Sequence, residues 1–196
     1  MKALLKLSNL IDALNEQVGR LTYWLILVMV LVSSGNAAVR YAFDRSSNAW
    51  LEIQWYLFSA VFLLGAGYTP LQNQHVRIDV ITGHLSRRAR AWIDVFGTLF
   101  FLLPMAIAIM WMSWPIFVQS YELHEGSSNA GGLIVWPARL MVPVGFFLLI
   151  LQGFSELIKR IAFLRGMIPD PTEKFQGPSA EEQLAEALRK ERGEPT

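Results

Sequence analysis

The second long apolar stretch of the sequence constrains the fold most. Leu51 to Tyr68 form an almost unbroken apolar run, close to the roughly twenty residues with which an α-helix crosses a bilayer core. Glu52 lies at the start of this run, and a polar turn that begins at Thr69 ends it. The pattern predicts a membrane-spanning helix whose two ends make specific polar contacts.

The composition agrees with a membrane protein. Hydrophobic residues make up 53% of the chain and charged residues only 17%, whereas soluble domains are about 25% charged. The sequence contains no cysteine, which excludes disulfides, thiolate metal sites and a cysteine nucleophile. Basic residues are not interleaved with aromatic residues in a patch, so we expect no nucleic-acid partner.

Three further apolar stretches bring the number of expected membrane spans to four. The third stretch is longer than an upright helix needs, so we expect it to tilt or protrude, and Pro104 and Pro115 could bend it. The sequence therefore predicts an all-α integral membrane protein with four transmembrane helices, in the lipid bilayer, at about residues 21–43, 51–69, 91–118 and 136–158.

The distribution of positive charge predicts how these spans are oriented. The loop from Thr69 to Arg90 carries four arginines, whereas the loop from Gln119 to Leu133 has no lysine or arginine. Loops rich in Lys and Arg stay in the cytoplasm, so we expect both termini to be cytoplasmic. Residues 161–196 are rich in Pro, Gly, Glu and Lys in their later part, which predicts a flexible cytoplasmic tail.

Residues 1–19 precede the first span and have helical periodicity. Apolar residues recur at spacings of three and four, with polar residues opposite, which predicts an amphipathic helix in the membrane interface. A solvated arm is one alternative. A cleavable signal peptide is another, since small residues follow at Gly35 and Ala37, but Asp12 and Glu16 are unsuited to its basic first part. The apolar residues are Leu4, Leu7, Ile11, Leu14 and Val18.

Arg40 and Glu52 lie equally far from the turn between the first two spans, which is centred near Ser46. They should therefore lie at similar depth, and we expect them to form an ion pair between the two helices. The alternative is that each side chain reaches the headgroups on its own. Trp50 and Trp55 fit an aromatic belt at this interface.

Two polar clusters could carry chemistry. His75, Arg77 and Asp79 follow the second span, either as an ion or partner site at the membrane edge or as a polar collar, which the spacing alone favours. The second cluster lies in a glycine-rich loop and could ligate a metal, but one histidine with two carboxylates is a weak signal. It consists of Glu122, His124 and Glu125.

The sequence contains no catalytic motif, phosphate-binding loop or zinc motif, so we expect no enzyme, cofactor or metal site. The centres of the spans are apolar, whereas transporters bind their substrates near the midplane. Four apolar helices with polar ends therefore predict a protein that packs beside another membrane protein.

Residues 10–160 resemble the small membrane subunit (DctQ-type) of tripartite ATP-independent periplasmic, or TRAP, transporters. The matching motifs are Arg40-Tyr41, Glu52-x-x-Trp55-Tyr56-Leu57 and His75-Val76-Arg77-Ile78-Asp79. The segment from Arg87 to Trp92, the Trp114 region and Glu125-Gly126-Ser127 with Gly131-Gly132 look most like the subgroup for 2-oxo acids and other monocarboxylates.

The resemblance implies a complex of three parts in the bacterial inner membrane. This small subunit would brace a large transmembrane subunit that imports organic acids with sodium, and would help to dock a periplasmic solute-binding protein. The expected topology alone makes the outer loop, Glu122 to Gly132, the candidate for contact with that protein, with Glu122, His124 and Glu125 as docking candidates. The candidates that the resemblance implies for subunit contacts or structural polar roles are Arg40, Glu52, Trp55, His75, Arg77 and Asp79.

Two rival functions remain open on the sequence. One is a scaffold or assembly subunit of an unrelated membrane complex. The other is an intramembrane metal or redox protein that uses His75, His84 and His124, although the expected topology places His124 on the opposite side of the membrane from the other two.

Overall fold

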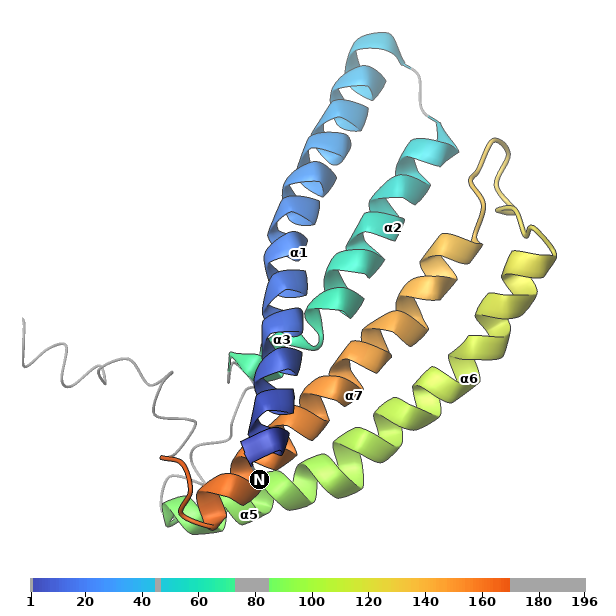
Figure 1. Cartoon of the computed structure of the whole chain (residues 1–196). Helices are drawn as coiled ribbons and strands as arrows, with labels where there is room; N and C mark the ends of the chain where they lie inside the picture. Colours follow the sequence, from blue (N-terminus) through green and yellow to red (C-terminus); the bar gives the residue numbers. More distant parts are fainter. Residues whose placement is uncertain (1, 45–46, 73–84, 170–196) are drawn as a thin grey trace, which may run out of the picture.

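The computed structural model describes residues 2–44, 47–72 and 85–169. These residues form helices and loops with no strand, apart from an isolated antiparallel bridge between Gly126 and Ile134. The elements (Figure 1) are α1 (Lys2–Phe43), α2 (Asn48–Gly65), α3 (Tyr68–Leu71), α5 (Arg87–Gly97), the π-helical turn η1 (Thr98–Leu102), α6 (Leu103–Glu122) and α7 (Trp136–Leu164).

The prediction of an all-α membrane protein with four membrane helices is confirmed. Among the described residues, four helical stretches are long and apolar enough to cross a bilayer, and each predicted span lies inside one of them. The predicted tail begins within α7, which continues to Leu164, and its residues from 170 onward lie outside the described residues. The four stretches are Lys2–Phe43, Asn48–Leu71, Arg87–Glu122 and Trp136–Leu164.

The expected interfacial helix and the first span form one unbroken helix, α1. Residues 15–25 contain no proline, and their one glycine, Gly19, is buried against Tyr68, so nothing in the sequence breaks the helix there. Its 42 residues extend about 63 Å at 1.5 Å per residue, roughly twice the thickness of a hydrocarbon core.

The face of α1 that packs in the bundle is more polar than its periodicity suggested. The buried residues recur at spacings of three and four, whereas Leu4, Leu7 and Leu14 are exposed. The apolar side of this amphipathic helix therefore points away from the other helices. The buried stripe consists of Ser8, Ile11, Asn15, Gly19 and Thr22.

The third stretch is a continuous helical run from α5 through η1 to α6, and Figure 1 shows that it curves. Pro104 has no N–H to donate to the helix, so an α-helical ladder cannot continue through it. The π-helical turn ends two residues before this proline, and the N–H of the next residue, Leu103, donates to the Thr98 carbonyl. The irregularity thus occurs where the sequence predicts a bend. Pro115 lies inside α6.

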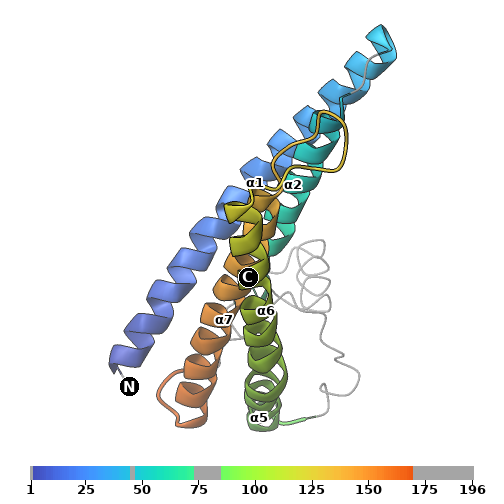
Figure 2. The same ribbon diagram turned by 90° about the vertical axis from the view of Figure 1, so that its right-hand side faces the viewer.

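The helices lie in the order α1, α2, α7, α6 across the bundle (Figure 1), and seen from the side α1 diverges from α5 and α6 (Figure 2). α7 packs on α1, α2, α5 and α6, whereas α6 packs on α7 alone among the long helices. We call the end with Phe43, Asn48 and the loop 123–135 the outer end, and the opposite end the inner end, following the predicted orientation. α7 is therefore the shared support of the bundle.

Close backbone approach joins α2 to α7. A Cβ atom on Gly145 would lie 2.5 Å from the carbonyl oxygen of Leu63, too close for any side chain. Small residues at such contacts let membrane helices pack by van der Waals interactions. In contrast, a Cβ atom on Gly35 in α1 would meet nothing within 4 Å.

We therefore expect Gly145→Ala to destabilise the purified subunit by about 1–3 kcal/mol, because the added methyl group forces α2 away from α7. Thermal unfolding followed by circular dichroism in mild detergent measures the effect. Gly35→Ala, also inside a long helix, is the matched control and should leave the melting temperature unchanged or raise it. Equal melting temperatures for the two variants would contradict the close packing of α2 on α7.

Candidate functional site

A buried carboxylate organises the outer end. Glu52, in the first turns of α2, is only 7% exposed. Its Oε1 atom accepts hydrogen bonds from the Ser127 hydroxyl and, at 2.9 Å, from the Asn129 side-chain amide, and its Oε2 atom accepts one at 2.6 Å from the Leu133 backbone N–H. We call these four residues the outer clasp. They join α2 to a loop about 80 residues away in the chain.

Two more contacts from α2 hold the same loop. The Asn48 side-chain amide donates to the Ala130 carbonyl and the Tyr56 hydroxyl donates to the Ile134 carbonyl, each at 2.9 Å. Inside the loop, the Ser127 N–H donates to the Leu133 carbonyl at 2.9 Å. The backbone of this glycine-rich segment is therefore fixed from both sides.

An ion pair closes the base of the loop. Arg139, in the first turns of α7, contacts Glu125 with both terminal nitrogens, at 2.6 Å to Oε1 and 2.5 Å to Oε2. This two-point geometry is the strong form of an arginine–carboxylate contact. Of the three predicted docking residues, Glu125 is thus bound to α7, while Glu122 and His124 remain exposed.

The predicted ion pair between Arg40 and Glu52 is wrong. The carboxylate of Glu52 makes its hydrogen bonds with the loop, and Arg40 is exposed beside a hollow that Asn36 and Gln54 also line. Equal distance from the turn places the two residues at similar depth, but it takes no account of donors brought in by a distant loop. A buried carboxylate needs several donors, and the loop supplies three.

A second polar cluster joins α1 to α7 near the inner end. The Asp12 Oδ1 atom accepts hydrogen bonds from the Ser155 hydroxyl at 2.6 Å and the Gln152 amide at 3.0 Å. Lys159 contacts Asp12 at 3.2 Å and Glu156 at 2.5 Å. We call these five residues the inner network. Two carboxylates and one ammonium group share it, so one of the two negative charges is compensated within the network.

The inner network continues into neighbouring contacts. The Asn15 amide donates to the Gln152 side-chain oxygen at 3.0 Å, and the hydroxyls of Ser8 and Ser155 lie 2.7 Å apart. On the other side of α7, Arg160 contacts Asp94 of α5 at 3.2 Å. Sequence reasoning missed the contact of Asp12 with Lys159 and the contact of Asp94 with Arg160. The available signal was the presence of opposite charges in different spans at similar distances from the inner end.

The remaining predicted site residues fall into two groups. Trp55 is 73% exposed on the outside of α2, so a contact with lipid or a partner stays a prediction. His75, Arg77 and Asp79 lie outside the described residues, as does His84. Among residues 2–44, 47–72 and 85–169, no group of His, Asp and Glu side chains is arranged to hold a metal ion.

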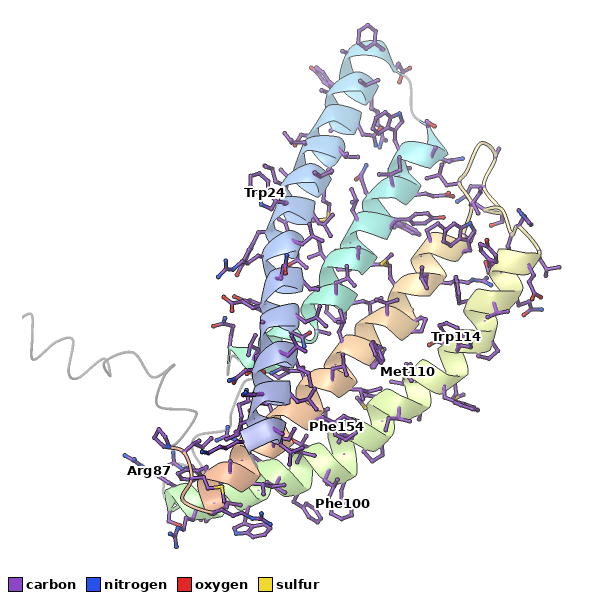
Figure 3. All side chains as sticks on the ribbon, in the orientation of Figure 1. Trp24, Arg87, Phe100, Met110, Trp114 and Phe154 are labelled. Atoms are coloured by element: carbon purple, nitrogen blue, oxygen red, sulfur yellow. The ribbon has the colours of Figure 1, made fainter. Side chains whose placement is uncertain are left out.

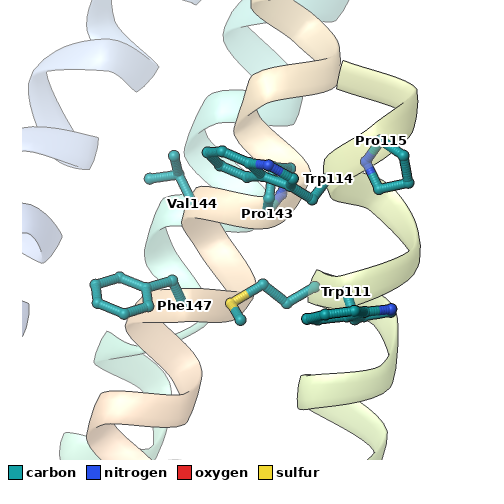
Figure 4. Close-up of a pocket in the computed structure, with 7 residues that line it drawn as sticks. Trp111, Trp114, Pro115, Pro143, Val144 and Phe147 are labelled. Atoms are coloured by element: carbon teal, nitrogen blue, oxygen red, sulfur yellow. The ribbon is translucent and has the colours of Figure 1, made fainter. Parts of the chain in front are cut away.

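The helix surfaces between the two clusters are apolar. Aromatic side chains such as Trp24 and Phe100 project outward from the bundle (Figure 3). Between α6 and α7, Trp111, Trp114 and Phe147 line a hollow of about 670 Å³ together with two prolines (Figure 4). A larger hollow of about 1020 Å³ lies between α2 and the α5–η1 segment, over α7. Such surfaces suit lipid or another membrane protein.

Comparison with known families is decisive for identity. Residues 29–163 match the family described as "Tripartite ATP-independent periplasmic transporters, DctQ component", which covers more than half of the chain. The chain belongs to the DctQ family of TRAP transporters. This DctQ-type small subunit is therefore an inner-membrane component of a transporter, in agreement with the resemblance noted from its motifs. Neither the curated proteins nor the solved structures compared with the chain include a match.

Membership of the DctQ family bears on the role of the outer clasp and the inner network. DctQ-type subunits work with a large membrane subunit and a periplasmic binding protein. The contacts of the outer clasp and the inner network are made within this chain. Both clusters therefore join separate elements of the small subunit.

We expect Asp12→Asn to lower the stability of the subunit by about 1–3 kcal/mol, because Lys159 loses one of its two charged partners and the donors of Gln152 and Ser155 lose a charged acceptor in a largely buried site. Glu16→Gln, one turn further along α1, is the matched control. It removes a carboxylate whose ion pair with Arg20 is exposed, so the loss should be at most about 1 kcal/mol. Denaturant or thermal unfolding measures both values, and equal losses would contradict a stabilising role of the inner network.

Proposed function

We propose that this DctQ-type subunit is the scaffold of a sodium-driven, binding-protein-dependent transporter that imports organic acids. The observation that carries the proposal is the match of residues 29–163, which include most of the four membrane helices, to the DctQ component. In this proposal the chain braces a large transmembrane subunit and helps to dock the periplasmic solute-binding protein. It does not itself bind the solute.

The arrangement of polar groups supports a bracing role. Five of the eight described polar side chains that are buried belong to the outer clasp or the inner network or bind to the inner network. A subunit whose elements are joined in this way can support a neighbour that moves. The exposed apolar surfaces support contact with a second membrane protein.

The hollow over α7 supports a close fit to a large subunit. Its walls come from helices that are held apart, α2 with α3 on one side and α5 with η1 on the other. Most of its lining is apolar and includes several glycines, which suits helix packing in lipid. Residues at the walls and floor include Val61, Phe62, Gly97, Phe101, Met105 and Gly153.

The solute class is proposed from motif similarity. The segments Arg87 to Trp92 and Glu125 to Gly132 resemble the subgroup for 2-oxo acids and other monocarboxylates. We therefore propose a 2-oxo acid as the solute, and the sodium gradient as the driving force for its uptake.

Native mass spectrometry of the tagged chain in mild detergent should recover it with a much larger polytopic chain. Proteoliposomes containing that complex, supplied with its binding protein, should accumulate radiolabelled pyruvate or another 2-oxo acid under an inward sodium gradient. Replacement of sodium by potassium should abolish accumulation. Recovery of the chain alone or as a homo-oligomer would contradict the scaffold role, whereas sodium-independent uptake would contradict only the driving force.

A further inference from the structure

The outer loop is ordered although its composition opposes order. Residues 126–132 include three glycines, and Gly131 has the left-handed backbone angle φ of +71°. Glycine loses more conformational freedom on folding than any other residue, so a loop of this composition needs external contacts to hold one shape. Figure 1 shows the loop projecting from the outer end of the bundle.

Glu52 supplies the central external contact. It receives a hydroxyl, a side-chain amide and a backbone N–H from three separate positions of the loop. An ionised carboxylate has two oxygens and only accepts hydrogen bonds, so it can satisfy all three donors at once. No neutral side chain of similar size has this capacity.

The loop backbone also passes too close to Glu52 for a side chain at Gly132. A Cβ atom there would lie 2.7 Å from the Glu52 Oε1 atom and 2.5 Å from the Cβ atom of Ser127. The loop backbone therefore runs alongside the carboxylate of Glu52 and lies close to it at several positions.

The clasp leaves a distinct set of side chains exposed at the outer end. Leu123 is 68% exposed, and Tyr121 and Ile134 are about half exposed. His124 stacks on Tyr121, with 6.5 Å between ring centroids, and Glu122 is exposed beside it. The loop contains no lysine or arginine, which predicts that this mixed apolar and polar surface faces the periplasm.

We propose that Glu52 is a positioning residue that fixes the loop beside the end of α6 and so completes the surface that the periplasmic binding protein contacts. The inference rests on the proposed function, because it requires that the chain helps to dock such a protein. Glu52 acts through the loop and does not touch the binding protein. Docking to a preordered loop avoids the entropy loss of ordering it at the moment of binding.

Glu52→Gln isolates this role. The substituted amide keeps one oxygen acceptor but turns an NH₂ group toward the donors of the loop, so at least one of Asn129 and Leu133 loses its partner. Asp44→Asn is the matched control, because Asp44 is an exposed acid at the same end whose positive φ of 50° an asparagine also tolerates. Asn129→Ala is a milder second variant that removes one donor and leaves the carboxylate intact.

Loop order is measured on a single spin label. The chain has no cysteine, so Ser128→Cys, at an exposed position of the loop, gives one labelling site on this chain, which is labelled before the complex is assembled. We expect an immobilised spectrum for the otherwise native chain and for Asp44→Asn, and a mobile component for Glu52→Gln. An unchanged spectrum in Glu52→Gln would overturn the claim that Glu52 orders the loop.

Docking is measured by uptake of radiolabelled pyruvate into proteoliposomes at increasing concentrations of the purified binding protein. For Glu52→Gln complexes that retain the large subunit, we expect the half-saturating concentration to rise at least tenfold, with the maximal rate within twofold of native. Asn129→Ala should give a smaller rise, and Asp44→Asn none. A simple loss of folding would lower the maximal rate without this selective shift.

The outcomes separate the two proposals. A native half-saturating concentration in Glu52→Gln, or a fall in maximal rate alone, would overturn the positioning role while leaving the scaffold function intact. If the native complex assembles but its uptake does not depend on a binding protein, the docking part of the proposed function fails first, and the positioning role fails with it.

Discussion

Polar side chains hidden from lipid are stabilised only by one another, and this constraint decides how α1 lies on α7. Asp12, Gln152 and Lys159 form hydrogen bonds and ion contacts that would be lost if either helix turned about its axis. The leucines on the opposite side of α1 are then exposed on the outside of the bundle. Because α7 also supports α2, α5 and α6, the α1–α7 contact sets the frame in which the other helices pack.

The same constraint acts at the outer end with a different result. There the buried acid, Glu52, has no basic partner among the residues that the structure describes, and backbone and amide donors from a loop satisfy it instead. The inner network thus joins two helices, whereas the outer clasp joins a helix to a segment that could otherwise adopt many conformations. At the inner end, the network stabilises the contact between two helices. At the outer end, the clasp holds a surface loop in place.

The sequence predicted the all-α fold and the four membrane helices because apolar length is a strong, local signal. The sequence also indicated that Glu52 makes a specific polar contact, but the predicted partner, Arg40, was wrong. Arg40 and Glu52 lie equally far from the same turn in the sequence. Asn129 and Leu133 lie beside Glu52 only in the packed tertiary structure. Partners of this kind depend on tertiary structure. The inner network was missed for the same reason, since Asp12 and Lys159 are 147 residues apart.

The π-helical turn before Pro104 has a consequence for the rotational phase of the third membrane helix. Such a turn accommodates one residue more than the α-helical ladder, and each residue of an α-helix corresponds to about 100° of rotation. Loss of a single residue from Thr98–Leu102 would therefore rotate α5 relative to α6 by about that angle. Asp94 would leave the side on which it meets Arg160, so the extra residue keeps the two halves of this helix in register with α7.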